Sequence, residues 1–295
     1  MIGVTPIIGI MLESLDTLTS LFDTIVVPVL LVELVVLLRV RALDWPRGKE
    51  MLANGVTFLL LIPAAVVGAL VWVPIFDAVG ALVPGSLPVT WWSIALAVLV
   101  ADLIYYWEHR ISHGRRLLWD LYHSVHHSSP RFDQTTSLRI GIFDGLLTIA
   151  FSLPMVALGF STEMAFAATA LVIAYQGWIH TELIDRMPRW FEAVFNTPSH
   201  HRAHHGNEHP YLDVNYGGIL IVWDRLFGTF QPEGERPIYG LTEQIESSNP
   251  LDIQFSQLRR LWAELRTDRS WRTRWRRLWN RPGWQPTDAA VRSAP

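Results

Sequence analysis

The chain has 295 residues, of which half are hydrophobic and only 17% are charged. With a positive mean hydropathy, this composition is unusual for a soluble globular domain and predicts an integral membrane protein. A net charge of −3 gives no reason to expect nucleic acid as a partner. The absence of cysteine excludes disulfides, thiolate metal sites and a cysteine nucleophile.

Five apolar segments of roughly 20 residues are candidate membrane spans. They are residues 20–40, 52–75, 91–107, 140–160 and 164–179. We therefore predict an all-α, polytopic membrane protein with about five spanning or membrane-embedded helices. No Lys or Arg precedes the first apolar segment, which therefore does not resemble a cleaved signal peptide.

The basic residues predict the orientation of the chain. Every Lys and Arg lies between Arg39 and Lys49, between Arg110 and Arg139, or from Arg186 onward. Five spans would bring these three segments to one side of the membrane, which the positive-inside bias makes the cytoplasmic side. We therefore expect a bacterial inner membrane or ER-like location, with the N-terminus outside and the histidines and C-terminus in the cytoplasm.

The histidines are grouped by spacing. Ten of the eleven form the sets His109-x-x-x-His113, His123-x-x-His126-His127, His180 and His200-His201-x-x-His204-His205. On a helix, residues three and four apart share one face, so each set directs its imidazoles to a common point. A zinc ion takes three or four protein ligands, so this number predicts two metal ions in a cytosolic lobe. A shell of imidazoles suits iron, zinc or copper better than calcium or magnesium.

Three acidic residues lie near these sets. Asp102 precedes His109 by two helical turns within an apolar segment, so we expect it to accept a hydrogen bond from a metal-bound imidazole. The alternative is a purely structural contact with a neighbouring helix. Asp224 could play the same part or pair with Arg225, and Glu108 is expected to be a solvated interfacial residue.

We expect three regions in the chain: N-terminal membrane helices over 1–90, a histidine-bearing catalytic region over 91–230, and a basic, Trp-rich cytosolic tail over 231–295. In the tail, apolar residues from Leu251 to Leu265 recur at helical spacing and predict an amphipathic helix. Such a helix could lie on the inner membrane surface or pack on the cytosolic lobe, because both arrangements bury the same face.

The segments around the histidines resemble the fatty acid hydroxylase and sterol desaturase superfamily over roughly Ala101 to Phe230. The matching strings are Asp102-Leu-Ile-Tyr-Tyr-Trp-Glu-His109-Arg, His126-His127-Ser-Ser, Asn215-Tyr-Gly-Gly and Trp223-Asp-Arg-Leu-Phe-Gly-Thr-Phe230. Within the superfamily, the likeness is greatest to the alkylglycerol monooxygenase branch and its bacterial relatives. The resemblance implies a membrane-bound, non-haem diiron enzyme that hydroxylates or desaturates an unactivated C–H bond of a lipid.

The resemblance also implies the metal ligands. Carried over residue by residue, they are His109, His113, His123, His126, His127, His180, His201, His204 and His205. His180 would otherwise be an interfacial cap of the fifth span. His200 is expected to point away from the shared face and to have a supporting role, and His209 matches no motif and is expected in a loop.

The resemblance further implies two iron ions, with zinc able to replace them in purified protein, and dioxygen as co-substrate. The lipid substrate would enter from the bilayer. The chain has no haem, flavin or Gly-x-Gly-x-x-Gly motif, so electrons would come from a separate protein or a small reductant. Likeness to the alkylglycerol branch suggests a pterin as that reductant.

Two functions of other kinds compete with this interpretation. A histidine-rich membrane metal transporter or buffer would also need many imidazoles, but transporters usually place ligands near the middle of the bilayer on broken helices. A zinc metalloprotease would need His-Glu-x-x-His, whereas the first motif here reads His109-Arg-Ile-Ser-His113.

Overall fold

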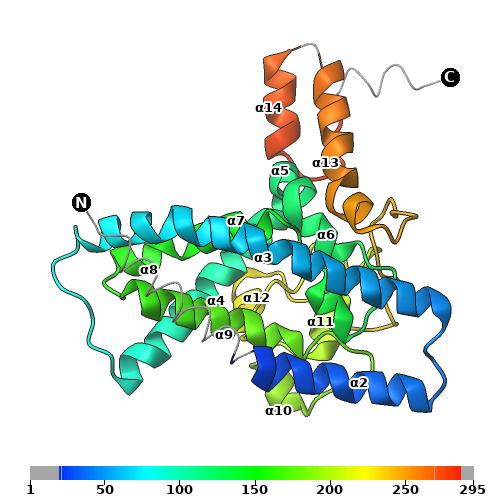
Figure 1. Cartoon of the computed structure of the whole chain (residues 1–295), viewed down its shortest axis with the longest axis horizontal. Coiled ribbons are helices and arrows are strands. Elements are labelled where there is room, and N and C mark those ends of the chain that lie inside the picture. The colour runs from blue at the N-terminus through cyan, green and yellow to red at the C-terminus, as the bar shows by residue number, and fades with distance from the viewer. Residues whose placement is uncertain (1–19, 21, 269, 287–295) are drawn as a thin grey trace.

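The computed structural model describes residues 20, 22–268 and 270–286 (Figure 1). Within that part of the chain the structure is helical, and the only β-pairings are two isolated bridges. The α-helices are α2 Val27–Arg39, α3 Trp45–Gly80, α4 Trp91–Gly114, α5 Arg116–Leu118, α6 Ser124–His127, α7 Asp144–Leu147, α8 Leu153–Ala157, α9 Thr162–Gly177, α10 Arg189–Glu192, α11 Pro198–His204, α12 Val222–Phe227, α13 Pro250–Thr267 and α14 Trp271–Trp279. Short π- or 3₁₀-helical turns are η1 Phe22–Val26, η2 Trp119–His123, η3 Gln134–Leu138 and η4 Thr148–Ser152. The prediction of an all-helical protein is confirmed.

Helix α3 is the longest element and runs along the whole long axis of the molecule (Figure 1). Its first turn is fixed by the Asp44 side chain, which accepts a hydrogen bond from the Arg47 N–H at 2.7 Å. At 36 residues, α3 is about 54 Å long, well beyond the roughly 30 Å hydrocarbon core of a bilayer. Among the described residues it is the one helix that is long and apolar enough to cross a membrane.

An apolar core joins α3, α4, α8 and α9. It includes Phe76 of α3, Ala101 of α4 and Val172 of α9, all of which are buried. The Phe76 ring contacts the Phe166 ring with centroids 5.0 Å apart. Because α4 continues from this core to His109 and His113, the apolar bundle ends at the histidine region.

The helix lengths do not establish the predicted five-span arrangement. The predicted fourth span, residues 140–160, is divided into α7, η4 and α8, which together cover Asp144–Ala157. This 14-residue stretch is about 21 Å long, less than the hydrocarbon core of a bilayer. The predicted outside location of the N-terminus concerns residues 1–19, which lie outside the described part of the chain.

The C-terminal region forms two helices where the sequence predicted one. Helix α13 ends at Thr267, and α14 begins after Ser270, whose hydroxyl accepts a hydrogen bond from the Thr273 N–H. The two helices project together from the rest of the molecule (Figure 1). In the last turn of α13, Glu264 pairs with both terminal nitrogens of Arg116, at 2.7 and 2.9 Å. Of the two alternatives for the tail, packing on the histidine region therefore describes α13.

Two glycines of α3 provide a test of the contact between α3 and α7. A Cβ added to Gly68 would lie 2.4 Å from the Gly145 carbonyl oxygen, whereas one added to Gly55 meets nothing within 4 Å. We expect Gly68→Ala to lower the free energy of unfolding by about 1–3 kcal/mol, because α7 must move away from α3. Gly55→Ala should raise it slightly, because alanine favours helix. Thermal unfolding of both variants in detergent measures the difference, and equal stabilities would contradict the α3–α7 contact.

Candidate metal centre

The histidines reach one region from four separate segments. Helix α4 supplies the first pair, η2 and α6 the next three, the residues after α9 supply His180, and α11 with its C-cap supplies the last three. The nine predicted ligands fall into two groups. Within each group, one ring nitrogen from each histidine lies within 4.8 Å of those of all the others. The groups are His109, His113, His123, His127 and His204, and then His126, His180, His201 and His205.

The two groups are adjacent and buried. Eight of the nine rings are buried, and only His126 is partly exposed. His127 of the first group stacks on His205 of the second, with centroids 4.3 Å apart. Histidines four residues apart share a cluster, whereas His126 and His204, each three residues after another histidine, belong to the other cluster, so the motifs interleave into one cluster of five rings and one of four.

Close nitrogen pairs show what these clusters can hold. The Nε2 atoms of His180 and His126 are 3.1 Å apart, and those of His201 and His180 are 2.9 Å apart. A metal–nitrogen bond of ~2.1 Å separates two ligand nitrogens by about 3.0 Å at a right angle and about 3.4 Å at a tetrahedral angle. The observed spacings therefore match neighbouring ligands of one ion.

The hydrogen bonds of the Nδ1 atoms explain why a cation is needed between the facing Nε2 atoms. His180 Nδ1–H donates to the Gln176 carbonyl at 2.7 Å, and His126 Nδ1–H donates to the Arg139 carbonyl at 3.2 Å. Each neutral ring then presents only a lone pair at Nε2. Two such lone pairs facing each other repel, and a metal ion between the rings removes that repulsion.

The first cluster has the same arrangement. His109 Nδ1–H donates to the Tyr216 carbonyl at 3.0 Å, and His204 Nδ1–H donates to the Val214 carbonyl at 2.7 Å. The Nε2 atoms of His109, His127 and His204 are buried and have no hydrogen-bond partner in the described chain. Buried polar atoms are rarely left without a partner, so these three fit metal ligands.

Burial also sets the protonation state. It lowers the pKa of His126 to about 4, and it lowers the pKa values of His127 and His205 well below 6.5. The neighbouring imidazoles lower them further, because one positive ring disfavours another. The rings are therefore neutral at physiological pH, the form in which imidazole binds metals.

The loop before α12 orients the first cluster, and two carboxylates hold this loop. Asp224 accepts the Tyr216 and Gly217 N–H groups, each at 2.7 Å. Asp102 accepts the Ile219 N–H at 2.6 Å, the Leu220 N–H at 3.0 Å and the Trp223 Nε1–H at 2.8 Å. Both acids therefore act on the backbone whose Tyr216 carbonyl contacts His109.

The predicted imidazole partner of Asp102 is wrong. Asp102 lies on α4 as expected and is buried, but its oxygens are taken by three N–H groups of the 219–223 segment. His109 donates to the Tyr216 carbonyl instead. The spacing of two helical turns placed both residues on one side of α4 without indicating which backbone would lie between them.

Two buried arginines hold the second cluster and were missed by the sequence analysis. Arg139 pairs with Glu50 at 2.8 Å, which fixes the backbone carbonyl that contacts His126. Arg202 of α11 pairs with Glu233 at 2.7 Å and donates to the Thr181 carbonyl at 3.0 Å, next to His180. The position of Arg202 within His200-His201-Arg-Ala-His204-His205 was the available signal, because a charge among buried ligands needs a partner.

Three further predictions concern residues near the clusters. Glu108 is buried, not solvated, and accepts hydrogen bonds from the Tyr122 hydroxyl at 2.8 Å and the Ser112 hydroxyl at 3.0 Å. Its position on the packed side of α4 explains the error. His200 and His209 lie outside both nitrogen groups, with His200 buried and His209 exposed.

Comparison with known proteins agrees with the histidine pattern. Residues 94–229 match the family model described as fatty acid hydroxylase. Alkylglycerol monooxygenase of Homo sapiens is 36% identical over 203 residues, which cover 69% of this chain and 44% of that protein. The chain thus matches less than half the length of this relative. No solved structure matches significantly.

Relatives of lower sequence identity are enzymes named for other lipids. Ornithine lipid hydroxylase OlsE of Rhizobium tropici is 30% identical over 52% of this chain and 46% of its own length. Lathosterol oxidase of Rattus norvegicus is 27% identical over 56% of this chain and 57% of its own length. The predicted resemblance to the fatty acid hydroxylase superfamily is confirmed, and the relatives are oxygenase enzymes.

The loop contacts of Asp102 predict the effect of Asp102→Asn. An asparagine has one oxygen for three N–H donors, and its own NH₂ group faces them. We expect a loss of about 1–3 kcal/mol in unfolding free energy, because at least one buried N–H loses its acceptor. Metal content should also fall, since the Tyr216 carbonyl is less well fixed.

Asp77→Asn is the matched control, because among the described residues the Asp77 side chain accepts only the Thr162 hydroxyl, at 3.1 Å, and an amide oxygen can do the same. Thermal unfolding and elemental analysis measure both variants. Wild-type stability and metal content in Asp102→Asn would contradict the role of this carboxylate in holding the loop.

Proposed function

We propose that this chain, which has a fatty acid hydroxylase match over residues 94–229, is a membrane-bound non-haem dimetal oxygenase acting on a lipid. The observation that carries the proposal is the pair of buried imidazole clusters, of five and four histidines. The reaction is hydroxylation or desaturation of an unactivated C–H bond with dioxygen. The relatives named above support iron as the metal.

Each cluster would hold one metal ion. The first ion would be bound by the group that contains His109 and His204, and the second by the group that contains His180 and His201. When bound, the two irons supply the redox chemistry that activates dioxygen. Electrons come from a separate protein or a small reductant, for which a pterin is our candidate.

The residues of the chain prepare the site for this chemistry. Backbone carbonyls of Gln176, Arg139, Val214 and Tyr216 each take one imidazole N–H and leave the opposite nitrogen free. The outward hydrogen bond fixes the orientation of each ring and raises its basicity as a ligand. Burial of eight rings limits the access of water to the centre.

The apolar bundle supports a lipid as substrate. Helix α4 leads from the core residues Ala97 and Ala101 directly to His109. A hydrocarbon chain lying along these helices would reach the metals without passing through water. The names of the relatives have in common a substrate with a large apolar part: an alkylglycerol, an ornithine lipid and a sterol.

A metal transporter or buffer is the second candidate. Transport sites are commonly built on helices interrupted near the middle of the bilayer. Helix α4, in contrast, is continuous from Trp91 to Gly114 and carries its two histidines in its last two turns. This arrangement favours an enzyme. A buffer would release its metal on demand and consume no dioxygen.

We expect the purified protein, expressed with ample iron, to contain two metal ions per chain. His127→Ala should lower metal content and abolish product formation, because the ring lies in the first cluster and stacks on the second. His209→Ala is the matched control, because His209 is exposed and belongs to neither cluster.

Elemental analysis and lipid mass spectrometry of cells with and without the gene provide the measurements. A gain of one oxygen in a lipid indicates a hydroxylase, and a loss of two hydrogens indicates a desaturase. Two bound metals with no change in any lipid would favour the buffer. One equivalent of metal or less would exclude the dimetal site.

The orientation of the chain is a separate proposal. We expect the 76–90 segment, which is the end of α3 and the loop before α4, to face away from the cytoplasm and the histidine region to face it, as the distribution of Lys and Arg indicates. Because the chain has no cysteine, Ser86→Cys and the control Glu246→Cys each introduce a single thiol. An impermeant thiol reagent should label Ser86→Cys in intact cells and Glu246→Cys only after lysis. The reverse labelling would overturn the orientation.

A further inference from the structure

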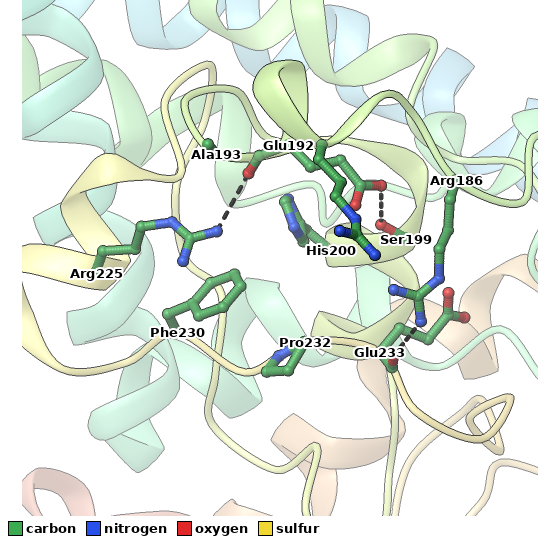
Figure 2. Close-up of a pocket in the computed structure, with 10 residues that line it drawn as sticks. Arg186, Glu192, Ala193, Ser199, His200, Arg225, Phe230, Pro232 and Glu233 are labelled. Carbon is green, nitrogen blue, oxygen red and sulfur yellow. Dashed lines mark hydrogen bonds between the residues drawn. The ribbon is translucent and has the colours of Figure 1, made fainter.

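A second site lies on the other side of α11 from the metal centre. It is a surface pocket of about 390 Å³ lined by residues of α10, α11 and α12 and by the chain after Phe230. Three arginines line it: Arg186, Arg189 and Arg225. Figure 2 shows Arg225 and Arg186 on opposite sides of the pocket, with His200 between them.

The charges of these arginines are not neutralised. Within the described chain none of the three forms an ion pair, in contrast to Arg202, which pairs with Glu233. Arg186 donates to the backbone carbonyl of Glu233, and Arg225 donates to the backbone carbonyl of Glu192 at 3.3 Å. Arg225 also lies 3.7 Å from the centroid of the Phe230 ring. Backbone and ring contacts orient a guanidinium but leave its positive charge in place.

Two carboxylates also line the pocket, and both have partners. Glu233 pairs with Arg202 through both oxygens, each at 2.7 Å. One oxygen of Glu192 accepts the Ser199 hydroxyl at 2.7 Å and the Met187 N–H at 3.0 Å. Glu233 is thus neutralised by a buried arginine, and the three unpaired guanidinium groups outnumber the remaining carboxylate.

His200 gives independent evidence for a ligand. Its side chain is 97% buried and lines the pocket, yet its Nδ1 atom has no hydrogen-bond partner in the described chain. An unpaired buried nitrogen costs free energy. Because this nitrogen has almost no accessible surface, a small rotation of the ring toward the pocket would let a bound polar group supply the missing hydrogen bond.

We propose that this pocket binds a phosphate group. A phosphate carries up to two negative charges and several acceptor oxygens, and guanidinium groups bind it through paired hydrogen bonds. A carboxylate ligand would leave more of the positive charge unpaired. The pocket volume exceeds that of a single phosphate, so part of an esterified group also fits.

Exposed apolar residues next in sequence to two of the pocket arginines favour a lipid headgroup over a soluble phosphate ester. Trp190, next to Arg189, is 72% exposed, and Leu226, next to Arg225, is 67% exposed. Exposed tryptophan and leucine beside arginines are typical of surfaces that contact the polar region of a bilayer. The pocket shares no residue with the two histidine clusters, so failure of this proposal would leave the proposed oxygenase function untouched.

The test is calorimetric titration of the full-length holoprotein in neutral detergent with inorganic phosphate and with glycerol phosphate. We expect saturable binding, and we expect Arg189→Gln to weaken it by about 10- to 100-fold through the loss of one charge-assisted contact. Arg189 is exposed, and its side chain makes no contact that folding depends on within the described chain, so the variant should fold. Arg266→Gln, an exposed arginine of α13, is the matched control.

Phosphate bound to the metals would be insensitive to Arg189→Gln. An unchanged affinity in this variant would therefore overturn the proposal, as would the absence of saturable binding.

Whether the natural ligand is a lipid headgroup or a soluble phosphate ester is resolved by repeating the titration in nanodiscs with and without phosphatidic acid. If phosphate binds in nanodiscs without phosphatidic acid but not in nanodiscs that contain it, the lipid headgroup occupies the pocket. A signal that persists in both nanodiscs identifies a soluble phosphate ester.

Discussion

The histidine region depends on one constraint, which is that a buried imidazole has two ring nitrogens and both need a partner. Where a backbone carbonyl accepts one N–H, the other nitrogen can only accept, as at His180 and His126. Packing two such rings with their Nε2 atoms 3.1 Å apart is unfavourable unless a cation lies between them. The stability of this region and its affinity for metal are therefore two descriptions of the same free energy.

That constraint explains the unusual backbone around the first cluster. Asp213 and Asn215 both have positive φ, at 59° and 55°, a conformation that Asp and Asn adopt more readily than most residues. The turn brings the Val214 and Tyr216 carbonyls to His204 and His109. Turning these carbonyls inward leaves N–H groups on the other side of the loop, and buried carboxylates of α4 and α12 accept them.

The sequence predicted which histidines gather at the site but not how they divide between the two clusters: His126 lies in a different group from His123 and His127, and His204 in a different group from His201 and His205. Spacing determines which side of a helix a histidine occupies, and this rule separated His200 from its neighbours, whereas His209 was set apart because it matches no motif. The contacts of Asp102 and Glu108 depend on which segment packs against α4 from more than ten residues away, and spacing carries no information about that. Hydropathy likewise found the apolar stretch 140–160 but not its division into three short helices.

Helix α11 shows how closely the two sites are built together. In its seven residues, His201 and His204 face the metal clusters, while Arg202 reaches the 181–185 segment that follows His180. His200 faces the arginine pocket, and its backbone carbonyl accepts the Asn215 side-chain amide. A change of position of α11 must therefore alter the ligand geometry, the Arg202–Glu233 pair and the pocket at once. Occupancy of the pocket would restrict the same helix that carries His201 and His204, so the two binding events act on one rigid element.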